Sequence, residues 1–213
     1  MNTATVSNIT VVTTDIDTAA LTNAISAADL SRGKDRTLPM LTAYRVELQN
    51  NKLQFITTDR YRLSVISLDL ANTAAANLAA SGLFNDGGLT IDGGGMYAIG
   101  KIKTKANTLA VSFSARGISA TYEGGTLTAP AADSDFPKWR SILDMQSKDQ
   151  STTGNYNPQY LSEAAKACKI IAGKDAKNTP LNITLRGNYP ATLTAKGDGL
   201  AIELLLMPVR IAK

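Results

Sequence analysis

An α+β fold built from a repeated unit is predicted by three observations on this 213-residue chain. Apolar residues recur at helical spacing in three places, short alternating segments typical of strands follow each of them, and turn residues separate those segments. The order of one strand, one helix and three strands therefore occurs three times. Such repetition predicts a modular architecture in which each unit shares its sheet with its neighbours.

The first unit contains a helix that follows a cap at Asp15 or Asp17. Its apolar face comprises Leu21, Ala24, Ile25 and Ala28. Strands are then expected at about 42–49, 53–58 and 61–69. A tight turn at Gln49-Asn50-Asn51 would join the first two of these strands, and the segment 70–88, rich in Ala and Asn, is expected to be a surface connection.

The second unit opens with a strand at about 88–91 and a helix that starts in the glycine-rich sequence GGGMYAIG. Its helix buries Met96, Ile99 and Ile102, and its strands are expected at about 108–114, 117–122 and 125–129. The third unit has a helix from about Pro158, since proline suits the first turn of a helix. The apolar face of that helix comprises Leu161, Ala164, Ala165, Cys168 and Ile171, and strands at about 181–186, 190–195 and 200–206 follow.

The polar segment 143–156 is predicted to be a linker between two parts of the chain. Residues 1–142 would form one complete domain of two units, and residues 157–213 a partial domain of one unit. The hydrophobic content of 44% is typical of a globular protein. No apolar run reaches the roughly 18 residues that span a bilayer, and no secretory signal is visible, so we expect a cytoplasmic protein that does not enter membranes. A single cysteine, Cys168, excludes an intrachain disulfide.

The absence of histidine excludes catalytic triads that use it and histidine-based zinc sites. Asp133 and Asp135 are interpreted as solvated loop acids rather than a catalytic pair, and GGGMYAIG lacks the lysine–serine pair of a P-loop. We therefore expect no enzyme activity, no metal and no cofactor. The net charge of +4 is compatible with a polyanion such as DNA but does not identify one.

Five segments together carry a family resemblance. They are LPMLTAYRVEL at 38–48, TDRYRL at 58–63, DFPKWR at 135–140, NPQYLSEAAKA at 157–167 and LMPVRI at 206–211. These segments, in this order, resemble the bacterial DNA polymerase III β subunits, the ring-shaped sliding clamps, over most of residues 10–211. The resemblance implies a DNA-clamp fold with antiparallel sheets outside and helices inside, and a processivity factor that encircles duplex DNA without reading its sequence. It also implies a DNA polymerase and a clamp loader as partners.

The resemblance implies a pocket for short clamp-binding peptides of partner proteins. Its residues would be Leu41, Thr58, Arg60, Tyr61, Arg62, Leu63, Pro137, Arg140, Ile142, Met207, Pro208, Val209 and Arg210. Apolar members would form the cavity, and the arginines would donate to peptide carbonyls or an acidic residue. Leu38 and Ser141 stand where many clamps carry arginine, so the rim would be less basic. Trp139 is expected to serve packing, and the alternative for the apolar residues is ordinary core.

Helices line the central hole in this family, so basic residues on them would face DNA. These are Arg32, Lys34, Lys101, Lys105, Lys166, Lys169 and Lys174. The alternative is an ordinary solvated helix face.

The number of units differs from the family pattern. Bacterial clamp subunits carry six units, and this chain has three, as if the half domain before residue 157 were deleted. Because a half domain leaves an open sheet edge, we expect self-association, and a ring of twelve units would need four chains. The short architecture suggests a phage or mobile-element version. The alternative function is a non-encircling decoy or adaptor that binds clamp-binding peptides.

Overall fold

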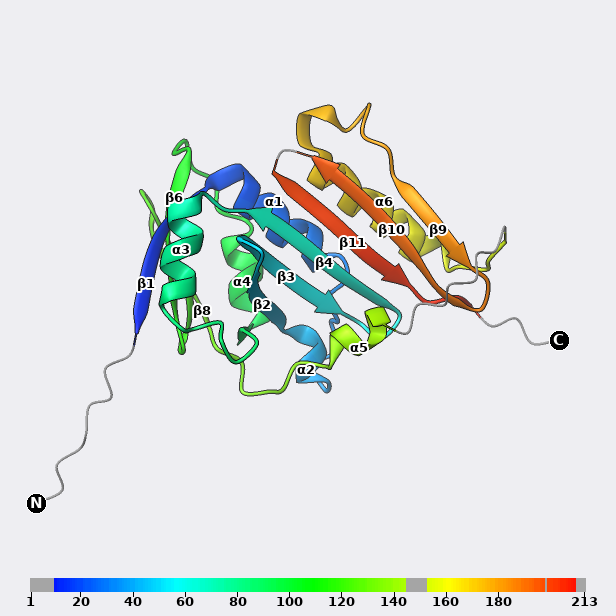
Figure 1. Cartoon of the computed structure of the whole chain (residues 1–213), viewed down its shortest axis with the longest axis horizontal. Coiled ribbons are helices and arrows are strands. Elements are labelled where there is room, and N and C mark those ends of the chain that lie inside the picture. The colour runs from blue at the N-terminus through cyan, green and yellow to red at the C-terminus, as the bar shows by residue number, and fades with distance from the viewer. Residues whose placement is uncertain (1–9, 145–152, 198, 210–213) are drawn as a thin grey trace, which may run out of the picture.

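The computed structural model describes residues 10–144, 153–197 and 199–209. Two antiparallel sheets and a layer of helices form the molecule (Figure 1). This arrangement confirms the predicted α+β fold with its repeated units.

The first unit consists of β1 (Val11–Asp17), α1 (Thr18–Asp29), the short α2 (Pro39–Thr42), β2 (Tyr44–Gln49), β3 (Lys52–Thr58) and β4 (Arg62–Asp69). Asp17 is the cap of α1, because its carboxylate accepts a hydrogen bond from the backbone N–H of Ala20 at 2.7 Å. The predicted turn between β2 and β3 is confirmed. Asn50 and Asn51 both have positive φ, which suits the right-handed twist of a two-residue hairpin.

The second unit consists of α3 (Asn72–Ala80), β5 (Leu89–Ile91), α4 (Gly93–Ile99), β6 (Thr108–Ser114), β7 (Gly117–Tyr122) and β8 (Gly125–Pro130). Helix α3 lies where only a surface connection was expected. Alanine has the highest helix propensity, and the helix buries Ala74, Ala75 and Leu78. Glycine is required at position 95 in α4, since a side chain there would collide with the backbone of Ala129 on β8.

The third unit consists of α6 (Pro158–Ala172), a short 3₁₀ turn η1 (Gly173–Asp175), β9 (Asn182–Arg186), β10 (Tyr189–Gly197) and β11 (Leu200–Leu206). A short helix α5 (Trp139–Asp144) lies in the chain before it, and its last residues fall inside the predicted linker. The helix α6 begins at the predicted proline. No strand precedes α6 within the described residues 153–157, whereas β1 leads directly into α1 and β5 leads into α4.

The two sheets are built by exchange between units. The smaller sheet has the order β1-β6-β7-β8, and the larger has the order β5-β2-β3-β4-β11-β10-β9. The first strand of unit one pairs with unit two, and the first strand of unit two pairs with unit one. The third unit joins the first through antiparallel pairing of β4 with β11, so one sheet runs continuously across the junction.

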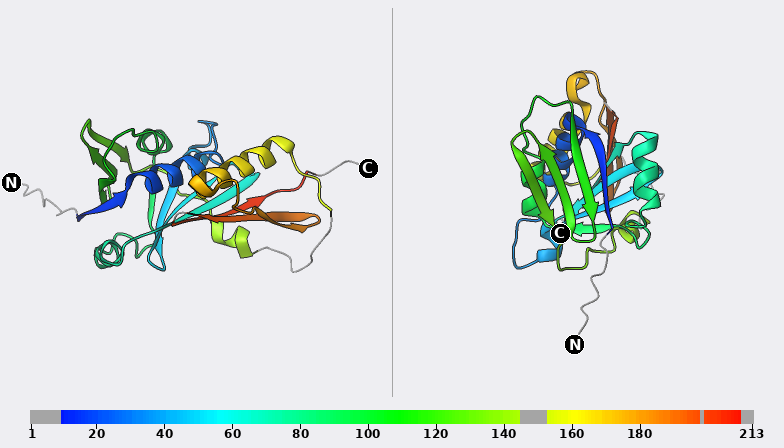
Figure 2. Two further views of the ribbon diagram at one scale, coloured as in Figure 1. Left: turned by 90° about the horizontal axis from the view of Figure 1, so that it is seen from above. Right: turned by 90° about the vertical axis from the view of Figure 1, so that its left-hand side faces the viewer.

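Two long helices, α1 and α6, cover one face of the larger sheet. Figure 2 shows α1 and α6 side by side on that face, with α5 on the opposite face. Helix α1 packs against both α4 and α6. Alanines dominate the buried faces of α1 and α6, which lets the helices approach closely; they are Ala24, Ala27, Ala28, Ala164, Ala167 and Ala172. Cys168 lies in this buried face, as predicted, and its burial raises the pKa of the thiol to about 11.

In the described part of the chain, no helix is long and apolar enough to span a bilayer.

Candidate functional site

The segments that resemble clamp signatures meet at the junction between β4 and β11. Leu63 at the start of β4 lies opposite Leu205 near the end of β11. Just beyond this pair, the backbone N–H of Met207 donates to the carbonyl of Tyr61 at 2.9 Å. Residues separated by almost 150 positions in the sequence are thereby held together by the sheet.

A small apolar cluster forms the floor of this junction on the outer face of the sheet. Its buried members are Ile56, Leu63, Val65, Trp139 and Leu205. Phe136, Ile142 and Leu143 pack against this cluster from the segment that leads into α5. The third motif segment therefore reaches the same place as the other two. Leu63 is only 2% exposed, so it supports the site from below rather than lining an open cavity.

Three apolar side chains stand exposed at the rim of the junction: Tyr61, Met207 and Val209. Pro208, which is partly buried, lies between the last two. A group of exposed apolar residues beside a packed floor is typical of a protein interaction site. Methionine is flexible and polarisable, which suits a surface that accepts different apolar side chains.

The turn between β3 and β4 holds Tyr61 outward. Thr58 donates its hydroxyl to the carbonyl of Arg62 at 2.6 Å, and the Asp59 carboxylate accepts the backbone N–H groups of Tyr61 and Arg62 at 3.0 and 2.8 Å. Arg60 has a φ of 81° and is exposed at the tip. The turn is thus fixed by its own side chains, so the position of Tyr61 is set before any partner binds.

Arg62 does not offer the donors that were expected for a peptide. It is buried, and its guanidinium donates to Asp59 at 2.7 and 3.0 Å and to Glu163 on α6. It also lies 4.2 Å from the ring centroid of Tyr160. Desolvation alone would lower the pKa of Arg62, but the hydrogen bonds to the two carboxylates raise it above its ordinary value. We therefore correct the assignment: Arg62 ties the turn of unit one to the helix of unit three.

The same contact affects Glu163. Desolvation would raise the pKa of its carboxyl group, but hydrogen bonds from Arg62 and Gln159 lower the pKa below its usual value. The ion pair therefore favours the charged form on both sides. Sequence reasoning missed Tyr160 and Glu163, because no local pattern indicates that residues about a hundred positions apart will make contact. It also missed Asp59, which stands only three residues before Arg62.

Pro137 and Arg140 lie to one side of the floor cluster. They line a shallow polar groove of about 470 Å³ together with Arg45 and Glu47. The buried Glu47 accepts a hydrogen bond from the indole N–H of Trp139 at 3.1 Å and another from Arg140. These two hydrogen bonds hold α5 against the sheet. Trp139 serves packing, as expected, whereas Glu47 was not identified from the sequence.

The remaining pocket predictions have mixed placements. Leu41 is buried on α2, next to Gly33, and is not at the surface. Arg210 lies outside the described residues.

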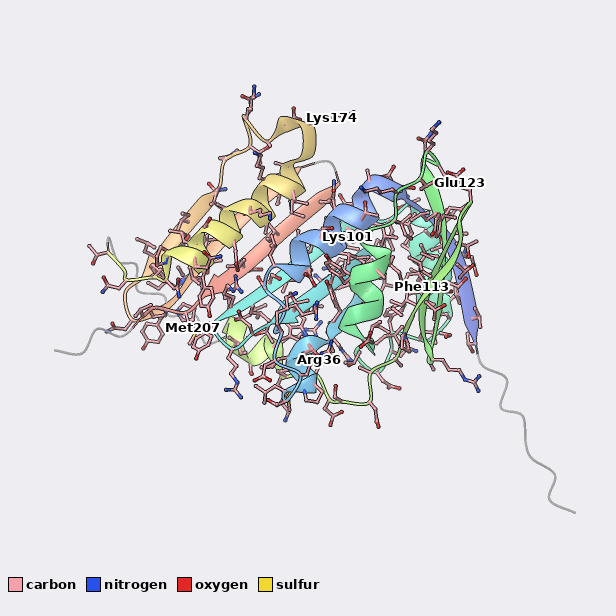
Figure 3. The ribbon with its side chains drawn as sticks, turned by 180° about the vertical axis from the view of Figure 1, so that it is seen from behind. Arg36, Lys101, Phe113, Glu123, Lys174 and Met207 are labelled. Atoms are coloured by element: carbon pink, nitrogen blue, oxygen red, sulfur yellow. The ribbon has the colours of Figure 1, made fainter. Side chains whose placement is uncertain are left out.

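Five of the predicted DNA-facing lysines are exposed on helices or in the segments that follow them. They are Lys101 and Lys105 after α4, Lys166 and Lys169 on α6, and Lys174 in the following turn. Figure 3 looks onto α1, α4 and α6 and labels Lys101 and Lys174, with Met207 just after the end of β11.

Arg32 and Lys34 differ from these lysines. Arg32 is half-buried, donates to Asp29 at 2.7 Å and to the carbonyl of Thr42 at 3.1 Å, and lies beside the ring of Tyr44. Its expected DNA-facing role is therefore replaced by a structural one. Lys34 is exposed but also pairs with Asp29, at 2.8 Å. Desolvation raises the pKa of Asp29, yet the hydrogen bonds from these two cations leave it below its usual value.

Comparison with known proteins places this architecture in a family. Residues 15–138 match the model for the central domain of the DNA polymerase III beta subunit. The beta sliding clamp of Micrococcus luteus is 26% identical over 183 residues, which cover 86% of this chain and 55% of that protein. The beta sliding clamp of Streptomyces coelicolor is 23% identical, with 89% of this chain and 64% of that protein covered.

Solved structures agree with these relatives. The sliding clamp of Caulobacter crescentus superposes with a TM-score of 0.69 at 14% identity, covering 99% of this chain and 68% of that one. The Pseudomonas aeruginosa sliding clamp with ligand gives a TM-score of 0.67 at 16% identity, covering 99% and 69%. The chain spans between about half and two thirds of the length of the curated relatives it matches. By the family model and the fold together, the chain belongs to the DNA polymerase III beta subunit family of sliding clamps.

Proposed function

We propose that this chain is a compact polymerase processivity factor, which encircles duplex DNA as a ring of several copies and docks partner proteins through short peptides. The observation that carries the proposal is the convergence of Tyr61, Met207 and the α5 segment at the junction of β4 and β11. In this proposal the apolar side chains of a peptide lie against Tyr61, Met207 and Val209. Arg60 and Arg140, both exposed, provide donors at the edges.

The helix side would face DNA. Lysines on flexible stems make weak, exchangeable and salt-sensitive contacts with phosphates, which suits a protein that must slide. The exposed lysines at 101, 105, 166, 169 and 174 all belong to helices or to the turns after them. None of these contacts requires a particular base sequence, and the site of action would be the cytoplasm.

Ring closure requires contacts between chains. Within the described residues, β1 and β8 end the smaller sheet and β5 and β9 end the larger one, and we assign the contacts between chains to the outer edges of β8 and β9. These edges lie toward opposite ends of the molecule (Figure 1). Unpaired edges favour association with another strand. A ring that contains twelve units would then join four chains through these two edges.

Threading onto DNA tests this function without a clamp loader. One end of a linear duplex is fixed to a bead, the protein is added, and the free end is then blocked with a bulky protein before a high-salt wash. We expect retention only when both ends are blocked, and release after a restriction enzyme cuts the duplex. Retention that is the same with free and blocked ends and that decreases with salt would indicate simple phosphate binding. Peptide binding without any retention would indicate the non-encircling adaptor instead.

A further inference from the structure

The third unit repeats the first two closely enough for positions to be matched. The helices of the three units begin after Asp17, Asp92 and Asn157. Each of these side chains accepts a hydrogen bond from a backbone N–H in the first helical turn, at 2.7, 2.7 and 2.9 Å. The cap residue therefore defines an equivalent origin in each unit, from which other positions can be compared.

The helix position four residues after the cap differs in exposure between the units. Leu21 in unit one and Met96 in unit two are buried, whereas Leu161 in unit three is 38% exposed. All three are large apolar residues. The third unit thus presents to solvent a side chain whose counterparts belong to the core.

The strand that follows each helix shows the same contrast. β2, β6 and β9 each end at a two-residue turn, which fixes their alignment. Three residues before the end of each strand stand Val46, Val111 and Ile183. The first two are buried, and Ile183 is 47% exposed.

These exposed positions surround an open apolar cleft. The cleft has a volume of about 320 Å³ and is lined mainly by Tyr156, Leu161, Ile183, Leu185, Leu193 and Leu206. The corresponding space between units one and two, lined by Leu21, Met96, Val111 and Phe113 among others, has only about 10 Å³ unfilled. The cleft is therefore lined like a hydrophobic core, but no second unit among the described residues fills it.

Units one and two show what fills such a space. In each unit, the strand before the helix pairs with a strand of the other unit, and the two pairings have the same register. Ile16, just before the cap of α1, lies opposite Leu109, and Ile91, just before the cap of α4, lies opposite Tyr44. Leu109 and Tyr44 both stand five residues before the end of their strands. In units one and two, the apolar face of each unit is thus covered by the other unit, and each contributes its first strand to the sheet of the other.

We propose that two copies of the chain associate through their third units about a two-fold axis. The segment Thr153–Tyr156 of one copy then pairs antiparallel with β9 of the other, and the reverse. By the register of units one and two, Tyr156 lies opposite Leu181, Asn155 opposite Asn182, and Gly154 opposite Ile183. Residues 153–157 and 181–185 contain no charged side chain, so the two-fold axis brings no like charges together. This inference does not depend on DNA or peptide binding.

Cysteine cross-linking tests the register. Asn155 and Asn182 match Thr90 and Arg45, whose side chains are within hydrogen-bond distance at 3.1 Å. The double variant Asn155→Cys with Asn182→Cys should therefore form covalent dimers under mild oxidation, seen on a non-reducing gel and by intact mass. Cys168 is buried with a raised thiol pKa, so it will not compete. The control, Asn155→Cys with Thr184→Cys, is out of register by two residues and should give no covalent dimer.

Free thiols, an intrachain disulfide, or equal dimer yields from the two pairs would overturn the proposed interface. The non-covalent equilibrium gives a second test, by light scattering without DNA. Ile183→Glu should weaken dimer formation by at least about tenfold, since it buries two carboxylates across the axis. Val11→Glu, which changes an exposed residue of the other sheet, should leave it unchanged. If the in-register cross-link forms but retention on DNA does not depend on blocked ends, the interface between third units is supported and only the encirclement of DNA is rejected.

Discussion

Replacing Arg62 by methionine is expected to lower the free energy of unfolding by about 3 kcal/mol, at the lower end of the range for breaking a buried ion pair. The change leaves the carboxylates of Asp59 and Glu163 without their shared cation. It also removes the contact with the ring of Tyr160. The loss stays at the lower end because both carboxylates keep some exposure to solvent. Urea denaturation followed by circular dichroism gives the value.

Lys52→Met is the matched control for this variant. Its ion pair with Asp69 is exposed on both sides, so the change should alter stability by less than about 0.5 kcal/mol. Equal urea midpoints for the two variants would contradict a structural role for Arg62.

The dependence of stability on pH gives an independent check of this ion pair. Because the folded-state pKa of Glu163 is lowered, its contribution is present above its unfolded pKa and is lost as the pH falls through the folded value. The variant Glu163→Gln should therefore lose less stability on acidification than the unmodified chain.

Replacing Met207 by glutamate is expected to weaken binding of a clamp-binding peptide by at least about tenfold, as for an apolar anchor at the centre of a small interface. Met207 is exposed, so the substitution should not disturb the core. The carboxylate of the introduced glutamate would be desolvated by the apolar side chains of the peptide. Fluorescence polarisation with a labelled polymerase peptide measures the change.

Val11→Glu provides the control for peptide binding, because it adds the same charge to an exposed apolar position in the smaller sheet. Its dissociation constant should match that of the unmodified chain. Leu63 is a poor choice for this test. It is buried, so a charge there would unfold the junction and would not report on binding. Unchanged affinity for a folded Met207→Glu variant would remove the proposed peptide surface.

Local patterns carried most of the fold. The strands β6, β7 and β11 lie where alternation predicted them, and the asparagine pair between β2 and β3 forms the predicted turn. Helix α3 was missed, because its alanines contribute little apolar contrast and its burial depends on packing against other elements. The joining of β4 to β11 could not be predicted from spacing, since strand pairing between distant units is decided by tertiary contacts.

The site was predictable in position but not in detail. Short segments at 58–63 and 206–209 gave its location, and the structure brings their backbones into contact. The roles of individual residues depended on partners elsewhere in the chain. Arg62 and Arg32 were expected to meet a ligand, yet each is held by a carboxylate of the protein. A free and a paired arginine look the same in a sequence.

Native mass spectrometry would show whether the chain works, as we propose, by assembling several copies into a ring. The chain has a mass of 22.5 kDa, and we expect a dominant species of four chains at working concentration. A single chain at every concentration would contradict it.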